Sequence, residues 1–213
     1  MRPRVKICGL TRPRDAEVAA EAGALYVGAI LVPDSPREVT PERARTFHEA
    51  SGLPLVVVMA DLSAVEVALA AERAGASIIQ LHGSEGEADL HALRGLGDWE
   101  LWKALRVRSG AEVLDEARRW AGVADGLLLD GWHPDQLGGT GRTFPWEEVE
   151  AIRPEWPDGL SLIAAGGLTA GNVGEAVQRL RPQTVDVSSG VEHQPGVKSP
   201  QKIHEFIAAA QDA

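Results

Sequence analysis

The sequence predicts an α/β fold, a single-domain (β/α)8 TIM barrel that spans residues 1–213. Short apolar runs alternate with helical patterns from end to end, which is typical of repeated βα units around a parallel sheet. Eight such units fit in 213 residues, and one closed barrel usually needs about 200 residues or more. No linker-like segment divides the chain. Alternation alone is also compatible with an open doubly wound sheet, so closure is an inference from the number of units.

Each expected strand is a short run of mostly apolar residues that is followed by a helical pattern. In chain order these runs are 4–8, 24–31, 55–60, 77–82, 99–107, 125–130, 160–165 and 184–188. The polar residues in these runs gather toward their carboxyl ends, where barrel enzymes build their sites.

The expected helices are supported by apolar spacing and by start signals. Apolar residues recur at i, i+3, i+4 and i+7 from Val173 to Leu180 and again from Ile203 to Ala210. The start signals are of two kinds, a Ser followed three residues later by Glu and a hydroxyl residue before a first-turn Pro. They occur at Ser63/Glu66, Ser84/Glu87, Ser109/Glu112, Thr40-Pro41 and Ser199-Pro200.

Composition and charge argue against several classes of protein. The formal net charge of −10 opposes the phosphate neutralisation that nucleic-acid binding requires, and it disfavours anionic membranes. No apolar run approaches the roughly 20 residues of a membrane span, and no signal-like segment follows the first residues, so we expect a cytoplasmic protein. A single cysteine excludes an intrachain disulfide and a zinc site built on several thiolates, and the histidines show no ligand spacing. We expect no metal.

Polar residues end four of the expected strands, Gly166-Gly167 follow a fifth and Arg37 follows a sixth. Because strand side chains alternate between faces, those that share the parity of the strand-end residues point into the barrel. The set comprises Cys8, Gln80, His82, Asp130, Asp186 and Ser188. Lys6 shares the face of Cys8, and strands one and eight become neighbours on closure. We therefore expect Lys6 to pair with Asp186, since a buried charge needs a partner.

Cys8 and Asp130 are candidates for acid–base chemistry. A free cysteine is commonly a small packing residue, and an Asp before Gly is commonly a turn residue. At an inward-facing strand end with cationic neighbours, however, a thiol can lose its proton and act as a base or nucleophile. A carboxyl held away from water can instead keep a proton near neutrality and act as an acid.

Two small-residue turns follow the last two strands, where many barrels bind phosphate. They contain Gly166-Gly167 and Ser188-Ser189-Gly190 and indicate a phosphorylated small-molecule substrate, with plain turns as the alternative. Arg37 is either a solvated loop cation or a bidentate clamp for a carboxylate. His82 is either a ligand contact or a hydrogen-bonded residue at the edge of the core. The glycine-rich segment 131–144 has the length of an active-site lid.

The six tryptophans divide into two groups. Trp132, in the long loop, is placed to contact a ligand ring, whereas His133 beside it is more typical of a surface position. The other five are expected to pack helices against the barrel; they are Trp99, Trp102, Trp120, Trp146 and Trp156.

Seven segments distributed along the whole chain carry a family resemblance. They are Val5-Lys6-Ile7-Cys8-Gly9-Leu10-Thr11, Ser35-Pro36-Arg37, Gln80-Leu81-His82-Gly83, Leu129-Asp130, Gly138-Gly139-Thr140-Gly141, Ala165-Gly166-Gly167-Leu168 and Asp186-Val187-Ser188-Ser189-Gly190-Val191-Glu192. Together they resemble the phosphoribosylanthranilate isomerases of tryptophan biosynthesis. The resemblance implies an Amadori rearrangement that needs no cofactor, with Asp130 as general acid and Cys8 as general base.

The resemblance also implies roles for the other candidates. Arg37 would bind the anthranilate carboxylate, Asp186 would hold sugar hydroxyls, and Gly139 and Thr140 would belong to a closing loop. The phosphate would lie against Gly166, Gly167, Ser189 and Gly190. The alternatives are another phosphosugar isomerase or epimerase on the same barrel and a non-catalytic phosphosugar-binding subunit. The acidic surface is compatible with a monomer or a homodimer.

Overall fold

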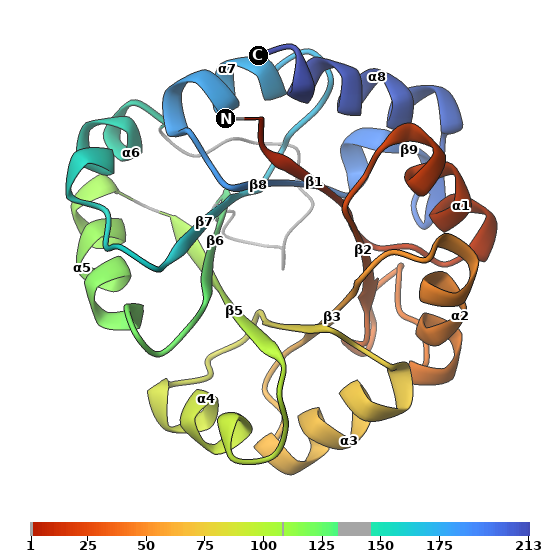
Figure 1. Ribbon diagram of the computed structural model, residues 1–213, viewed down its shortest axis with the longest axis horizontal. Helices are drawn as coiled ribbons and strands as arrows, with labels where there is room; N and C mark the ends of the chain where they lie inside the picture. Colours follow the sequence, from red (N-terminus) through yellow and green to blue (C-terminus); the bar gives the residue numbers. More distant parts are fainter. Residues whose placement is uncertain (1, 108, 132–145) are drawn as a thin grey trace.

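Eight parallel strands close into a barrel in chain order, β1 to β8, in a computed structural model that describes residues 2–107, 109–131 and 146–213 (Figure 1). Closure is made by β1 and β8, which pair in parallel with Lys6 opposite Asp186. The predicted (β/α)8 barrel is therefore confirmed. The strands are β1 (Arg4–Ile7), β2 (Tyr26–Ile30), β3 (Leu55–Met59), β4 (Ile78–Leu81), β5 (Glu100–Val107), β6 (Gly126–Gly131), β7 (Ser161–Ala164) and β8 (Thr184–Val187).

Helices form a ring outside the strands (Figure 1). They are α1 (Pro13–Ala22), α2 (Pro41–Ser51), α3 (Ala64–Ala74), α4 (Glu87–Arg94), α5 (Gly110–Trp120), α6 (Trp146–Ile152), α7 (Val173–Leu180) and α8 (Pro200–Gln211), with short 3-10 turns η1 (Arg153–Glu155) and η2 (Ser189–Val191). None of the helices in the described ranges is long and apolar enough to cross a membrane.

The predicted helix starts are correct at four of five places. Ser63 and Glu66 form a full capping box, and the hydroxyls of Thr40, Ser109 and Ser199 each accept a backbone N–H of their helix. The start predicted at Ser84 is wrong.

Helix α4 begins at Glu87 with Gly86 as its N-cap, and Asp89 accepts the N–H of Gly86 at 2.8 Å. The Ser84 hydroxyl instead donates to Asp61 Oδ1 at 2.6 Å. Ser84 thus binds Asp61, in the loop after β3, and does not cap α4. The Ser84/Glu87 spacing in the sequence cannot show this contact with a residue of another loop.

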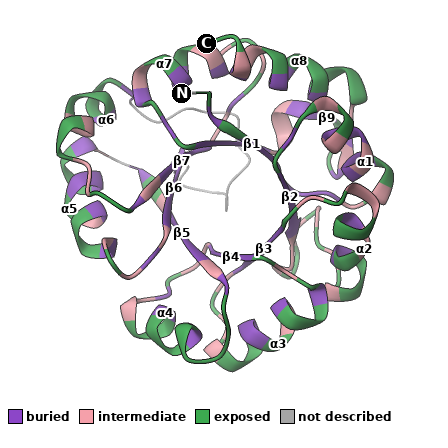
Figure 2. Ribbon diagram, in the orientation of Figure 1, coloured by how far each residue is buried: buried purple, intermediate pink, exposed green. Residues whose placement is uncertain are grey.

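The apolar residues form two separate cores. A large layer between strands and helices contains the outward side chains of the strands, and a smaller cluster fills the barrel interior. Figure 2 shows the strands mainly in the colour of buried residues, whereas the helices have both buried and exposed stretches. Trp99, Trp120, Trp146 and Trp156 belong to the outer layer, as predicted.

The prediction for Trp102 is wrong, because Trp102 lies inside the barrel with its ring edge against Tyr26, 5.5 Å between centroids. Its neighbour on β4 is Gln80, which also points inward. Gly126 makes room for it, since a Cβ there would lie 2.8 Å from the indole. Trp102 and Ala104, two residues apart on β5, both point into the barrel, whereas Leu101 and Val107 point outward. The alternation along the strand, and not the size of the side chain, decides the side on which Trp102 packs.

A short hairpin that the sequence did not predict follows β8. Its strands, β9 (Glu192–Gln194) and β10 (Val197–Lys198), pair antiparallel between η2 and α8. Thr11, in the loop after β1, donates to the carbonyl of Gly196 at the hairpin turn. Arg12 donates to the carbonyl of Lys198 at 3.2 Å. The hairpin is therefore held against the mouth of the barrel beside the end of β1.

Candidate active site

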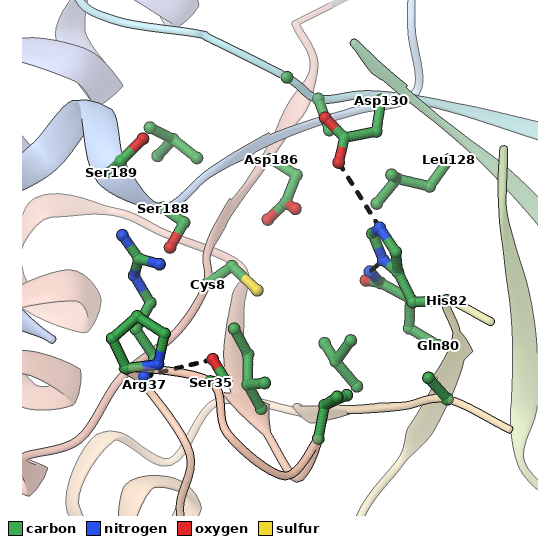
Figure 3. Close-up of a pocket in the computed structure, with 18 of the residues that line it drawn as sticks. Cys8, Ser35, Arg37, Gln80, His82, Leu128, Asp130, Asp186, Ser188 and Ser189 are labelled. Atoms are coloured by element: carbon green, nitrogen blue, oxygen red, sulfur yellow. Dashed lines mark hydrogen bonds and ion pairs between the residues drawn. The ribbon is translucent and has the colours of Figure 1, made fainter. Parts of the chain in front are cut away.

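A cavity of about 590 Å³ opens at the carboxyl ends of the strands, where the sequence placed the polar residues. Its lining includes most of the predicted site residues, which are Cys8, Arg37, Gln80, His82, Asp130, Gly166, Gly167, Asp186, Ser188 and Ser189. All of these except the two glycines are labelled in Figure 3. Gly190 is not part of the lining. Gly139, Thr140 and Trp132 lie outside the described residues.

Lys6 is the centre of a buried polar cluster below Cys8. Its ammonium donates to Gln80 Oε1 at 2.8 Å and to Cys8 Sγ at 3.2 Å, and it lies 3.2 Å from Asp186 Oδ1. The predicted ion pair between Lys6 and Asp186 is confirmed. Gly28, on the neighbouring strand, leaves room for this cluster, because a Cβ there would lie 2.9 Å from Lys6 and 3.0 Å from the sulfur.

Burial and charge act against each other in this cluster. Burial alone would lower the pKa of Lys6, but the charges of Asp186 and Cys8 raise it above its ordinary value. Burial and the charge of Asp186 raise the pKa of the Cys8 thiol, and Lys6 and Lys198 offset only part of that increase. Burial likewise raises the pKa of Asp186 against the charge of Lys6. Lys6 is thus the group that favours the thiolate of Cys8.

We expect Lys6→Met to lower the free energy of unfolding by about 3–5 kcal/mol, because it leaves the buried Asp186 carboxylate without its partner. Chemical denaturation near neutral pH measures this loss. Since Asp186 can relieve the unpaired charge by taking a proton, the loss should shrink as the pH falls. A variant as stable as the wild type near neutrality would contradict the view that the pair is ionised.

Hydrogen bonding connects this cluster to Asp130 through Gln80 and His82. An ammonium can only donate, so the Gln80 carbonyl faces Lys6 and its NH2 group faces His82 Nδ1, at 3.0 Å. In the neutral imidazole, Nδ1 is then the acceptor and Nε2 carries the hydrogen. Nε2 lies 3.5 Å from Asp130 Oδ2. His82 was expected to be either a ligand contact or a hydrogen-bonded residue at the edge of the core. It lines the cavity and is also hydrogen-bonded, so its position is compatible with both.

Asp130 and Cys8 face the same space from different strands. Both residues line the cavity, and in the view of Figure 3 the carboxylate of Asp186 lies between the carboxyl of Asp130 and the sulfur of Cys8. Asp130 ends β6 and is 7% exposed, and Cys8 follows β1 and is 5% exposed. A carboxyl and a thiol thus border one cavity, which is an arrangement that acid–base catalysis can use.

The glycines of the two small-residue turns also have packing roles. Gly166, with φ of 76°, lies against Asp130, because a Cβ there would be 2.6 Å from Oδ1. A Cβ on Gly190 would collide with the carbonyl oxygen of Leu168, so this glycine lets the turn after β8 pack on the turn after β7. The Ser188 hydroxyl accepts from Lys198 Nζ at 3.4 Å. Only Gly166, Gly167, Ser188 and Ser189 of these turns border the cavity.

Arg37 borders the cavity but already has a partner. Its Nε and Nη2 donate to the two carboxylate oxygens of Glu192, each at 2.7 Å, and Lys198 Nζ donates to Glu192 Oε1 at 2.9 Å. Neither Glu192 nor Lys198 was predicted as a site residue, although Glu192 is the last residue of the segment 186–192. Within the described ranges, no group of three or more His, Cys, Asp or Glu side chains could hold a metal ion.

Comparison with known proteins gives a consistent result. The family model of N-(5′-phosphoribosyl)anthranilate isomerase matches residues 5–209. A protein of that name from Nostoc punctiforme is 42% identical over 207 residues, 96% of each chain. The crystal structure of phosphoribosyl anthranilate isomerase from Thermus thermophilus is 36% identical and superposes with a TM-score of 0.83, over 97% of both chains.

Two further solved structures add information about ligands and assembly. One is a phosphoribosyl anthranilate isomerase in complex with reduced 1-(o-carboxyphenylamino)-1-deoxyribulose 5-phosphate. It is 29% identical, with a TM-score of 0.83 over 99% of this chain and all of the other. The other describes monomers generated from the dimeric enzyme of Thermotoga maritima, 31% identical, with a TM-score of 0.84 over 99% of this chain and all of the other.

Proposed function

The chain belongs to the N-(5′-phosphoribosyl)anthranilate isomerase family, and we propose that Asp130 is the general acid and Cys8 the general base of its reaction. The enzyme converts N-(5-phospho-β-D-ribosyl)anthranilate to 1-(2-carboxyphenylamino)-1-deoxy-D-ribulose 5-phosphate, an Amadori rearrangement of tryptophan biosynthesis. The observation that supports the two roles is the placement of one carboxyl and one thiol on the same cavity, with a buried ammonium 3.2 Å from the sulfur.

The reaction begins with a proton from Asp130. Transfer of this proton to the ribose ring oxygen breaks the bond between that oxygen and C1′, and the nitrogen lone pair forms a Schiff base with C1′. His82 lies 3.5 Å from Asp130 Oδ2 and can stabilise the carboxylate that remains. The other oxygen is then free to face the sugar.

The Cys8 thiolate completes the rearrangement by removing the proton from C2′. The electrons of the C–H bond move into the Schiff base, which gives an enolamine, and the enolamine ketonises to the product. Lys6 stabilises the thiolate through its charge and its hydrogen bond to the sulfur. Each turnover leaves one proton more on Cys8 and one fewer on Asp130, so both must exchange a proton before the next cycle.

The remaining site residues have binding roles in this proposal. Arg37 binds the anthranilate carboxylate, and Asp186 holds sugar hydroxyls in reach of both catalytic groups. The turns after β7 and β8 bind the phosphate through Gly166, Gly167 and Ser189, which line the cavity, and Gly190 allows the two turns to pack together behind them. Gln80, His82 and Ser188 complete the wall of the substrate cavity. The expectation that Gly139 and Thr140 belong to a closing loop, which would keep water from the Schiff base, concerns residues outside the described ranges and stays a prediction.

Three broader inferences accompany this assignment. We infer that residues 1–213 form a single domain, because the barrel closes between its first and last strands. A charged phosphosugar stays in the compartment where it is made, which favours the cytoplasm as the place of action. Assembly as a monomer or a homodimer stays a prediction. The family assignment favours this reaction over another phosphosugar isomerase and over a non-catalytic binding subunit.

The direct test is to follow the fluorescence of freshly generated phosphoribosylanthranilate after purified protein is added. We expect a decay that depends on enzyme concentration and exceeds the spontaneous breakdown of the substrate. Binding without consumption would favour a non-catalytic subunit. Consumption that Cys8→Ala and Asp130→Asn leave intact would keep the reaction and reject the residue roles.

A further inference from the structure

The β9–β10 hairpin supplies a carboxylate, that of Glu192, which accepts two hydrogen bonds from Arg37. We propose that Glu192, held by Lys198, is a positioning residue that turns one fixed edge of the Arg37 guanidinium toward the substrate. In this way it sets the preference of the enzyme for an aryl amine that carries a carboxylate. This inference rests on the proposed role of Arg37 as the carboxylate clamp.

The first argument is a count of hydrogen-bond donors. A guanidinium has five N–H groups in a rigid plane. Glu192 accepts one from Nε and one from Nη2 of Arg37, each at 2.7 Å, so it occupies the side edge of the guanidinium. Three N–H groups are left, and two of them, one on Nη1 and one on Nη2, form the end edge, which can hold a second carboxylate through two parallel hydrogen bonds. The ion pair with Glu192 therefore leaves the end edge of the Arg37 guanidinium available to bind the carboxylate of the substrate.

The second argument is burial. The side chains of Arg37, Glu192 and Lys198 are 13%, 6% and 0% exposed. In such surroundings a bidentate ion pair fixes the orientation of the guanidinium much better than an exposed pair would. Gly9 permits the approach, because its φ is 68° and a Cβ there would lie 2.5 Å from Arg37 Cδ.

The third argument is charge. A lone Glu192 would neutralise Arg37 and weaken its attraction for a substrate carboxylate. Lys198 contacts Glu192 Oε1 at 2.9 Å, so two cations and one carboxylate leave a net positive charge at the cavity wall. Burial opposes ionisation of Glu192, but Arg37 and Lys198 outweigh it and lower the pKa of that carboxyl. The carboxylate is therefore present to hold Arg37 near neutral pH.

The hairpin itself is anchored, which makes the grip rigid. The Asp15 carboxylate accepts the N–H of Lys198 at 3.2 Å, and Glu192 Oε1 accepts the N–H of Gly196 at 3.1 Å. Lys198 Nζ also donates to the carbonyl of Ser188 at 3.1 Å, which ties the hairpin to the end of β8. The hairpin, which was not predicted from the sequence, is thus tied to α1, to the end of β8 and to Arg37.

The test compares the affinities of two stable ligands by calorimetry. The first is the reduced product, 1-(2-carboxyphenylamino)-1-deoxyribitol 5-phosphate, and the second is its phenylamino counterpart without the carboxyl group. We expect the wild type to bind the first about 10- to 100-fold more tightly, as for a charge-assisted pair. Glu192→Gln should lower this ratio by about tenfold and leave the affinity for the carboxyl-free ligand within about twofold.

Two further variants serve as controls. Glu85→Gln removes a carboxylate that is equally buried and paired with Lys103 at 2.8 Å, but that does not border the cavity. It should lower stability and leave the ratio unchanged. Arg37→Lys should lower the ratio, and adding Glu192→Gln to it should lower the ratio no further, because the residue that Glu192 positions is already lost. If Glu192→Gln fails to fold, Glu192→Asp keeps the charge but loses reach and should lower the ratio.

Several outcomes would overturn the proposal. A ratio that falls in Arg37→Lys but not in Glu192→Gln rejects the positioning role and keeps the clamp. A ratio unchanged in both variants rejects the clamp itself. A ratio that rises in Glu192→Gln shows that Glu192 competes with the substrate. Ribitol 5-phosphate, which lacks the aryl amine, is measured as a third ligand. If Arg37→Lys and Glu192→Gln each weaken the binding of all three ligands by the same factor, Arg37 faces the phosphate and the proposal is wrong.

Discussion

Replacing Asp130 by asparagine should lower kcat by a factor of about 10²–10⁴ and change KM only slightly. The amide keeps the shape of the side chain and can still accept from His82 Nε2, which lies 3.5 Å from Oδ2 in the wild type. It has no proton to transfer to the ribose ring oxygen. The loss should therefore fall on the chemical step, and steady-state kinetics with the fluorescence assay separates it from binding.

A matched control lies at the other end of the same strand. Asp125 precedes β6 and accepts from Arg94 and from the N–H of Leu101, at 2.6 and 2.7 Å, on the face of the barrel opposite to the cavity. Asp125→Asn should lower stability and leave kcat unchanged. If Asp130→Asn kept more than about a tenth of the activity, ring opening would not depend on this acid.

The fold and half of the buried cluster could be predicted because both follow from periodicity. A repeat of eight βα units leaves few architectures, and the two-residue period of a strand decides which side chains point inward. Lys6 and Asp186 have inward parity on the two strands that close the barrel, so their pairing was a geometric consequence of closure. The same parity placed Cys8 at the mouth.

The partners of Arg37 could not be predicted because they depend on an irregular element. The strands β9 and β10 have three and two residues and show no apolar period, so the hydrophobic pattern of the sequence did not predict this hairpin. Its turn at Gly196 brings Lys198 back onto Glu192, which is a tertiary result of loop packing. Ser84 illustrates the same limit, since Asp61 on another loop removes it from its expected cap. Irregular segments are positioned by contacts between residues that are far apart in the sequence, and rules based on neighbouring residues do not predict such contacts.

Replacing Cys8 by serine should lower kcat by a factor of about 10²–10⁴, because a hydroxyl at this position cannot supply an anion to remove the C2′ proton. Serine nearly preserves the size of the side chain and can still accept from Lys6. The variant should therefore fold and bind the reduced product as tightly as the wild type. Full activity in Cys8→Ser would mean that another group removes the proton.

The ionisation of Cys8 can be measured directly because it is the only cysteine of the chain. Thiolates react with iodoacetamide and thiols do not, so the alkylation rate rises with pH through the pKa of this residue. Burial and the charge of Asp186 raise that pKa above the ordinary value of a cysteine thiol, so we expect the half-maximal rate at a higher pH than for a small free thiol measured alongside. Bound reduced product should slow the reaction. A half-maximal rate at a lower pH than for the free thiol would mean that Lys6 and Lys198 outweigh burial and favour the thiolate in the free enzyme.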